Sequence, residues 1–99
     1  MRTTLHFTNA LKSRTDLTWE ELNQQFDSQV YTAGQTCPHK IVRNKMKRYT
    51  DQSFVVFPDA NLFCAVRADG SLATAMYLDG RWGYKDQPYD PDAHFGRKS

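Results

Sequence analysis

Two Asp-Gly dipeptides in the second half of this 99-residue chain place the strongest limits on its fold. Asp69-Gly70 and Asp79-Gly80 separate runs that are rich in β-branched and aromatic residues. Asp-Gly between such runs is typical of a β-hairpin, because a type I′ turn needs positive φ at both central residues. Pro58 suits the first central position of a further turn over residues 58–61. The pattern predicts an antiparallel meander with strands at 54–57, 62–67, 72–78 and 81–85.

Two-residue turns would also fix the register of these strands. The expected pairs are Val66 with Ala73, Cys64 with Ala75, and Leu62 with Tyr77. This register predicts one face that is apolar throughout, made of Leu62, Cys64, Val66, Ala73, Ala75, Tyr77, Trp82 and Tyr84. The other face is mixed and rather basic, with Phe63, Ala65, Arg67, Leu72, Thr74, Met76, Leu78, Arg81 and Lys85. We expect the helices to pack on the apolar face and the mixed face to meet solvent or a partner.

The first half of the chain predicts a helix with a clear beginning. Thr18 and Glu21 have the spacing of a capping box, in which each side chain accepts a hydrogen bond from the other residue's backbone N–H. Trp19, Leu22 and Phe26 then form one apolar stripe, so a helix is expected from Trp19 to Phe26 or Asp27. A short strand is expected at residues 30–31. Upstream, alternating apolar residues predict a strand over 3–7, and the polar stretch 9–16 predicts a loop.

A second, strongly basic helix is expected in the middle of the chain. Pro38 suits the first turn, and Val42, Met46 and Tyr49 form its apolar stripe up to residues 50–51. Five of the nine residues from Lys40 to Arg48 are Lys or Arg, and no acidic residue lies between Asp27 and Asp51. Because the charges elsewhere nearly cancel, this stretch accounts for the whole net charge of +2.

Together these elements predict one α+β domain over residues 1–85. It comprises an antiparallel meander of three to four strands, a possible N-terminal edge strand, and two helices packed on one face. Residues 86–99 are rich in Pro and Asp and are expected to form a flexible tail. No apolar run is long enough to span a membrane, and no secretory signal is expected. The two cysteines are expected to be reduced thiols, in the cytoplasm.

The basic helix is the leading candidate for a binding site. Lys and Arg on one helical face contact phosphates, and Arg43 or Asn44 can reach base edges. The predicted nucleic-acid-binding residues are Lys40, Arg43, Asn44, Lys45, Lys47 and Arg48. The connection over residues 27–37 is too long for a helix-turn-helix motif. Two alternatives remain for the same patch: an acidic protein surface, or a solvated helix that contributes only solubility.

The mixed sheet face is a second candidate. In composition, Phe63 with Arg67, Arg81 and Lys85 is similar to a platform that stacks bases and contacts phosphates. Phe63 and Met76 also fit a second, small hydrophobic layer, and we favour this core interpretation.

The sequence has no clear catalytic or metal-binding signature. Cys37 at a helix N-terminus with His39 nearby has the chemistry of a nucleophile and its base, but no third member or oxyanion hole is identifiable. Cys37, His39, Cys64 and His94 would be enough ligands for zinc, but their spacing matches no known pattern. Asp59, Asp69 and Asp79 lie in predicted turns, where Asp serves the backbone. We therefore expect no enzyme activity, no cofactor and no metal.

One stretch carries a resemblance to known proteins. The expected first strand followed by L-T-W-E-E-L, Leu17 to Leu22, resembles the start of some phage and plasmid replication proteins. A compact chain without catalytic motifs is also similar to small phage-encoded accessory proteins that bind and block host machinery. The expected function is a non-enzymatic module that contacts nucleic-acid phosphates through the basic helix. The alternative is an inhibitor that docks on a host protein through the basic helix or the sheet face.

Overall fold

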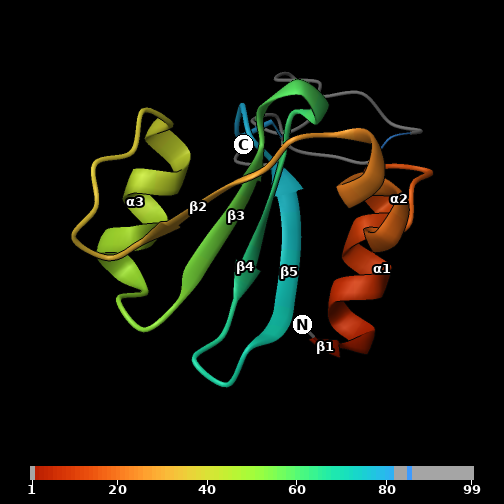
Figure 1. Cartoon of the computed structure of the whole chain (residues 1–99). Helices are drawn as coiled ribbons and strands as arrows, with labels where there is room; N and C mark the ends of the chain where they lie inside the picture. The colour runs from red at the N-terminus through yellow and green to blue at the C-terminus, as the bar shows by residue number, and fades with distance from the viewer. Residues whose placement is uncertain (1, 82–84, 86–99) are drawn as a thin grey trace, which may run out of the picture.

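A five-stranded sheet with helices on both faces forms the centre of the computed structural model, which describes residues 2–81 and residue 85 (Figure 1). The strands are β1 (Arg2–Thr3), β2 (Gln29–Thr32), β3 (Ser53–Phe57), β4 (Leu62–Val66) and β5 (Ser71–Tyr77). Their order across the open sheet is β1-β5-β4-β3-β2. The β1 strand pairs parallel with β5, and the other neighbours are antiparallel. The fold is therefore α+β, as the sequence predicts, but the sheet is mixed.

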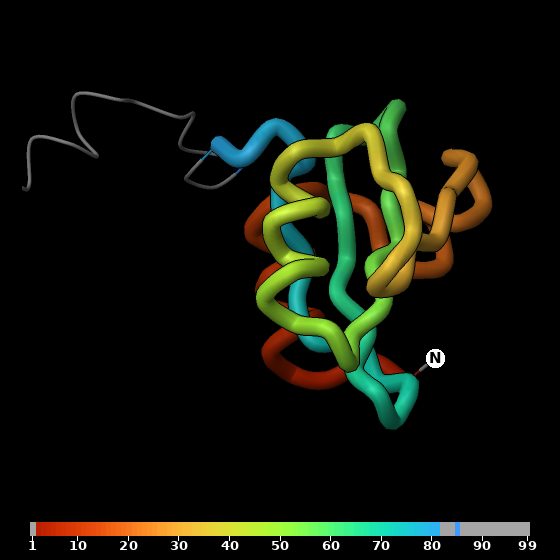
Figure 2. The backbone as a smooth tube through the Cα atoms, turned by 90° about the vertical axis from the view of Figure 1, so that its left-hand side faces the viewer, coloured from red at the N-terminus to blue at the C-terminus, as the bar shows by residue number. Residues whose placement is uncertain are grey.

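Three helices cover the sheet. Figure 1 shows α1 (Leu5–Arg14) and α2 (Trp19–Gln25) on one face and α3 (Lys40–Arg48) on the other. In Figure 2, α3 lies in front of the strands. The expectation of two helices on a single face is wrong. The expectation fails because both faces of the sheet are apolar and both need cover. In β3 the side chains of both faces are buried, namely Phe54, Val55, Val56 and Phe57.

The N-terminal segment differs most from the expectation. An N-terminal edge strand exists, as expected, but it is only β1 at Arg2–Thr3; the predicted strand bounds of 3–7 and the loop over 9–16 are wrong, because α1 occupies nearly all of this stretch. Thr4 caps the helix by accepting a 3.0 Å hydrogen bond from the Phe7 N–H. Phe7 and Leu11, four residues apart, are buried on the sheet, whereas Leu5 is 77% exposed. The helical spacing of Phe7 and Leu11 thus prevails over the short strand-like alternation before it.

The capped helix, the short strand and the basic helix of the first half all form, but the basic helix is shorter than expected. It begins at Lys40 after the N-cap residue His39, so Pro38 lies before the helix and not in its first turn, and it ends at Arg48. At α2 the Glu21 N–H donates to Thr18 Oγ1 (3.1 Å) and the Thr18 N–H donates to Glu21 Oε1 (3.0 Å), which completes the capping box. The short strand expected at residues 30–31 is β2, an edge strand. The basic helix is α3, held on the sheet by buried Val42 and Met46.

The β4–β5 hairpin follows the predicted register only in part. Leu62 pairs with Tyr77 and Cys64 with Ala75, as expected, but Val66 pairs with Leu72 because β5 carries a bulge at Ala73. The loop closes through hydrogen bonds from the Gly70 N–H to Arg67 O (2.9 Å) and from the Arg67 N–H to Ser71 O (2.8 Å). This is a three-residue loop with Gly70 at positive φ, in place of the expected type I′ turn.

The bulge reverses the faces of two residues. Leu72 joins the core under α1 and α2, with Phe7, Leu11, Leu22, Val55, Phe57, Leu62, Cys64, Val66, Ala75 and Tyr77. Ala73 joins the core under α3, with Cys37, Val42, Met46, Phe54, Val56, Phe63 and Ala65. A one-residue shift moves a side chain to the opposite face of a sheet, so both assignments change together.

Several predictions concern residues outside the described part of the chain. Of the expected strand at 81–85, only Arg81 and Lys85 are described, and neither is in a strand. The pairings of Trp82 and Tyr84, the position of His94 and the tail over 86–99 lie outside the described residues.

The expected turn at 58–61 is a short 3-10 helix, η1 (Pro58–Ala60), followed by Asn61 at φ 55°. Among the described helices, none has the length and apolar character that would let it cross a membrane.

Candidate nucleic-acid interface

The outward face of α3 carries most of the predicted binding residues. Val42 and Met46 anchor the helix on the sheet, and this turns the polar positions of the helix to solvent. Lys45 is half-buried, and the other predicted residues are exposed, namely Lys40, Arg43, Asn44, Lys47 and Arg48. The structure therefore brings the six residues together on one element that forms one side of the molecule (Figure 2).

The positive charge of α3 has no carboxylate partner among residues 2–81 and 85. The three salt bridges found there join Arg2 to Asp69, Arg81 to Asp79, and Lys85 to Asp16, all away from this helix. The first turn of α3 has no acidic residue, and its last turn holds Lys45, Lys47 and Arg48. Cations suit the negative end of a helix, but three of them also repel one another. Within the part of the chain that the structure describes, this helix therefore presents positive charge that no carboxylate neutralises.

The cations of α3 have different local roles. The Arg43 guanidinium donates a 3.0 Å hydrogen bond to the Cys37 carbonyl, so it also holds the loop before the helix. Lys45 Nζ and Arg48 Cζ lie 5.8 Å and 5.9 Å from the centre of the Tyr49 ring. Lys40 and Lys47 make no hydrogen bond or ion pair within the described part of the chain, which leaves both ammonium groups available to a ligand.

A cleft of about 240 Å³ lies between the C-terminal half of α3 and the sheet. Its apolar lining comes from the second core: Phe54, Phe63, Ala65, Ala73 and Met76. Its polar and aromatic lining comprises His6, Lys45, Tyr49, Gln52, Arg67 and Thr74. Arg67 from the end of β4 and Lys45 from α3 thus border the same cleft, although they are distant in the sequence.

Tyr49 is a site residue that sequence reasoning missed. Its spacing from Val42 and Met46 predicts a place in the buried stripe of the helix, yet its side chain is 38% exposed. Tyr49 is the C-cap residue of α3, with φ −120° and ψ 76°, and the change of backbone direction there turns the ring to the border of the cleft. One feature of the sequence could have indicated this exposed position: Tyr49 directly follows Arg48, at the end of the basic stretch.

The second predicted surface is not assembled. Phe63 is 1% exposed and packs 6.3 Å from Phe54 beneath α3, so the core interpretation of this residue is confirmed. Arg67 borders the cleft, whereas the Arg81 guanidinium lies 4.3 Å above the Tyr77 ring. Lys85 is on the opposite side of the sheet, where its backbone N–H donates to Ser13 O and its ammonium group contacts Asp16.

The arrangement around Cys37 does not favour catalysis. Cys37 is 2% exposed, and its thiol donates a long 3.9 Å hydrogen bond to the His39 carbonyl instead of contacting the imidazole. The His39 ring packs edge-on against Tyr31. Cys64 is also a free, buried cysteine, and burial raises the pKa of its thiol to about 12. No group of three or more His, Cys, Asp or Glu residues in the described part of the chain could hold a metal ion.

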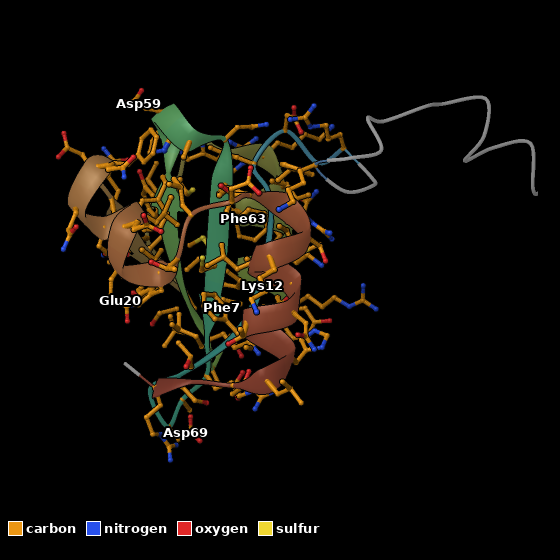
Figure 3. The ribbon with its side chains drawn as sticks, turned by 90° about the vertical axis from the view of Figure 1, so that its right-hand side faces the viewer. Phe7, Lys12, Glu20, Asp59, Phe63 and Asp69 are labelled. Carbon is orange, nitrogen blue, oxygen red and sulfur yellow. The ribbon has the colours of Figure 1, made fainter. Side chains whose placement is uncertain are left out.

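A second cleft, of about 270 Å³, lies between α1 and the start of α2. Figure 3 shows this side of the molecule, with Phe7, Lys12 and Glu20 labelled. Its lining includes two cations and two carboxylates, namely Lys12, Lys85, Asp16 and Glu20. Because these charges balance, this cleft has no preference for an anion, unlike the cleft beside α3.

No family model, curated protein or solved structure matches this chain. The possible functions therefore follow from its own residues and their arrangement.

Proposed function

We propose that the protein is a non-enzymatic module that binds nucleic acid and that α3 makes the main contact with phosphates. The observation that carries the proposal is the positive charge along the exposed face of this helix, for which residues 2–81 and 85 supply no carboxylate partner. Phosphates attract such a surface without regard to base sequence, because most of the affinity comes from release of the counterions that surround the nucleic acid. Arg67 supports the proposal, since it extends the positive surface from α3 onto the sheet across the cleft.

Contact through the cations of α3 makes a quantitative prediction for salt. The logarithm of the association constant should fall linearly with the logarithm of salt concentration, with a slope of about 0.7–0.9 for each phosphate contacted. We expect this behaviour in fluorescence anisotropy titrations of labelled single-stranded and duplex DNA and RNA. Lys40→Glu combined with Lys47→Glu should remove most of the binding, because it reverses two charges at positions without a partner in the described part of the chain.

A charge-matched control separates local contact from a general effect of net charge. Lys47→Glu on α3 and Lys12→Glu on α1 change the net charge equally, and both side chains are exposed. Only the first should weaken binding strongly and reduce the salt slope. Equal losses from the two variants would show that α3 is not the interface, and no salt-sensitive binding to any of the four ligands would contradict the proposed function.

The alternative function is docking on an acidic surface of another protein, as a small phage-type inhibitor would do. The same cations serve both functions, but a packed protein interface depends less on salt than phosphate contacts do. We propose a cytoplasmic setting for either function, because both cysteines in the chain are free and buried and need no oxidising compartment.

A further inference from the structure

We infer that the cleft between α3 and the sheet receives one unpaired base, and that the preferred ligand is therefore a single strand. The inference rests on the proposed function, since the cations of α3 would hold the phosphates on either side of that base. Three features of the cleft support it: its size, the exposed ring at its border, and the placement of charge around it.

The size and lining of the cleft suit one planar ring. Its volume of about 240 Å³ is below the ~300–1,000 Å³ of sites that enclose drug-sized ligands. The apolar part of its lining includes Phe54 and Phe63, whose rings are themselves buried and so present a fixed surface. Gln52 and Thr74, both half-buried, supply donors and acceptors for the edge of a base.

Tyr49 supplies the stacking surface. Its ring is exposed at the border of the cleft, while Phe54 and Phe63 pack against each other below. Bases stack on exposed aromatic rings with little regard to sequence, and loss of one such ring typically lowers affinity by roughly 5- to 100-fold. A base within a duplex is covered on both faces by its neighbours, so only an unpaired base can stack in this way.

Cations lie close to the ring on which the base would stack, within reach of the phosphates that flank it. Lys45 Nζ and Arg48 Cζ are within 6 Å of the centre of the Tyr49 ring, and Arg67 borders the cleft from the sheet. A strand that places one base in the cleft would therefore meet cations on both sides of it. His6, exposed in the first turn of α1, adds a further polar group to this border.

The test compares Tyr49→Ala and Tyr49→Phe with the unchanged protein, by anisotropy with an oligonucleotide and with the same sequence as a duplex. Tyr49→Ala should weaken single-strand binding by roughly 5- to 100-fold, leave duplex binding within about twofold, and leave the salt slope unchanged, because no cation is lost. Tyr49→Phe should bind like the unchanged protein. Thermal unfolding of both variants confirms that the fold is kept.

A second readout reports stacking directly. A fluorescent base analogue within the single strand should be quenched on binding, and Tyr49→Ala should abolish this quenching even at saturation. Arg67→Gln should instead reduce the single-strand salt slope by about 0.7, the value for one contact, whereas Lys12→Gln should not.

The outcomes separate this inference from the proposed function. Salt-sensitive binding that Lys40→Glu with Lys47→Glu removes, but that Tyr49→Ala does not weaken, would overturn the base-binding cleft and keep the phosphate interface. Equal losses of single-strand and duplex binding in Tyr49→Ala would also overturn it. Absence of binding to every ligand would overturn both.

Discussion

The two faces of the sheet are covered in different ways. On the first face, α1 and α2 close a core in which Trp19 packs edge-on against both Phe7 and Phe57, at 5.7 Å and 5.9 Å between ring centres. On the second face a single helix, α3, covers the sheet through Val42 and Met46 and leaves a cleft at its C-terminal half. The comparison indicates that the two faces have different roles. The first face supplies most of the packing, and the second face combines modest packing with exposed charge.

The largest effect should come from removing the central ring of the first face. Phe7 is 1% exposed, and Phe7→Ala should lower the free energy of unfolding by about 3–5 kcal/mol, through lost burial and the cavity that remains. Met46→Ala on the second face should cost less, about 2 kcal/mol, because Met46 is smaller than Phe7, is 6% exposed, and lies in the smaller of the two cores. Urea denaturation measures both, and Leu5→Ala, at a highly exposed position of the same helix as Phe7, is the control.

If Met46→Ala lowered the free energy of unfolding more than Phe7→Ala does, the second face and not the first would supply most of the stability. This result would mean that α3 is the main source of stability and that its charged face cannot be altered independently of the fold. A change of more than about 0.5 kcal/mol for Leu5→Ala would show that residues near the N-terminus contribute beyond their burial.

Alkaline pH should destabilise the first face through Cys64. Burial raises the pKa of this thiol from 9.0 to about 12, so the folded state keeps the proton while the unfolded state loses it above pH 9. The folded state then binds more protons, and stability falls as pH rises from 9 towards 12, by roughly 1 kcal/mol for each pH unit.

Urea denaturation at neutral pH and at pH values above 9 tests this effect. Cys64→Ala should be less stable at neutral pH, because it leaves a small cavity, but its stability should fall less steeply above pH 9. The same slope in both proteins would assign the alkaline loss to other groups. A thiol reagent should also react slowly with the folded protein, since both cysteines are buried.

Sequence reasoning succeeded where the signal is local. The capping box at Thr18 and the apolar spacing within α2 and α3 depend on residues within a few positions of one another, and both helices form, although α3 is about two residues shorter at each end than expected. The register of Leu62 with Tyr77 was also correct, but the bulge at Ala73 ended its validity near the loop. A bulge has little local signal, because it depends on the match between loop geometry and packing on both faces.

The features that sequence reasoning missed depend on longer stretches of sequence or on tertiary structure. The α1 helix was missed because a five-residue alternation around Leu5 resembles a strand, whereas the helical pair Phe7 and Leu11 is apparent only over a longer window. The second covered face had a signal in the unbroken apolar run 54–57, which fits a strand buried on both sides. The cleft has no local signal in the sequence, because Arg67 and Lys45 border it together only once α3 lies on the sheet.

The smallest effect on stability should come from the charged face of α3, and it is the sharpest test of the division between the faces. In Lys47→Gln, the repulsion between Lys47 and Arg43, four residues apart, is relieved, and this should stabilise the helix by about 0.2–0.5 kcal/mol. The same change removes a cation from the last turn, which costs a similar amount. The free energy of unfolding should therefore stay within about 0.5 kcal/mol of its original value, while the salt slope for nucleic acid falls by about 0.7–0.9. Urea denaturation and anisotropy on the same preparation measure the two quantities. A clear loss of stability together with unchanged binding would show that Lys47 serves the fold, and that the exposed charge of α3 is not there for a ligand.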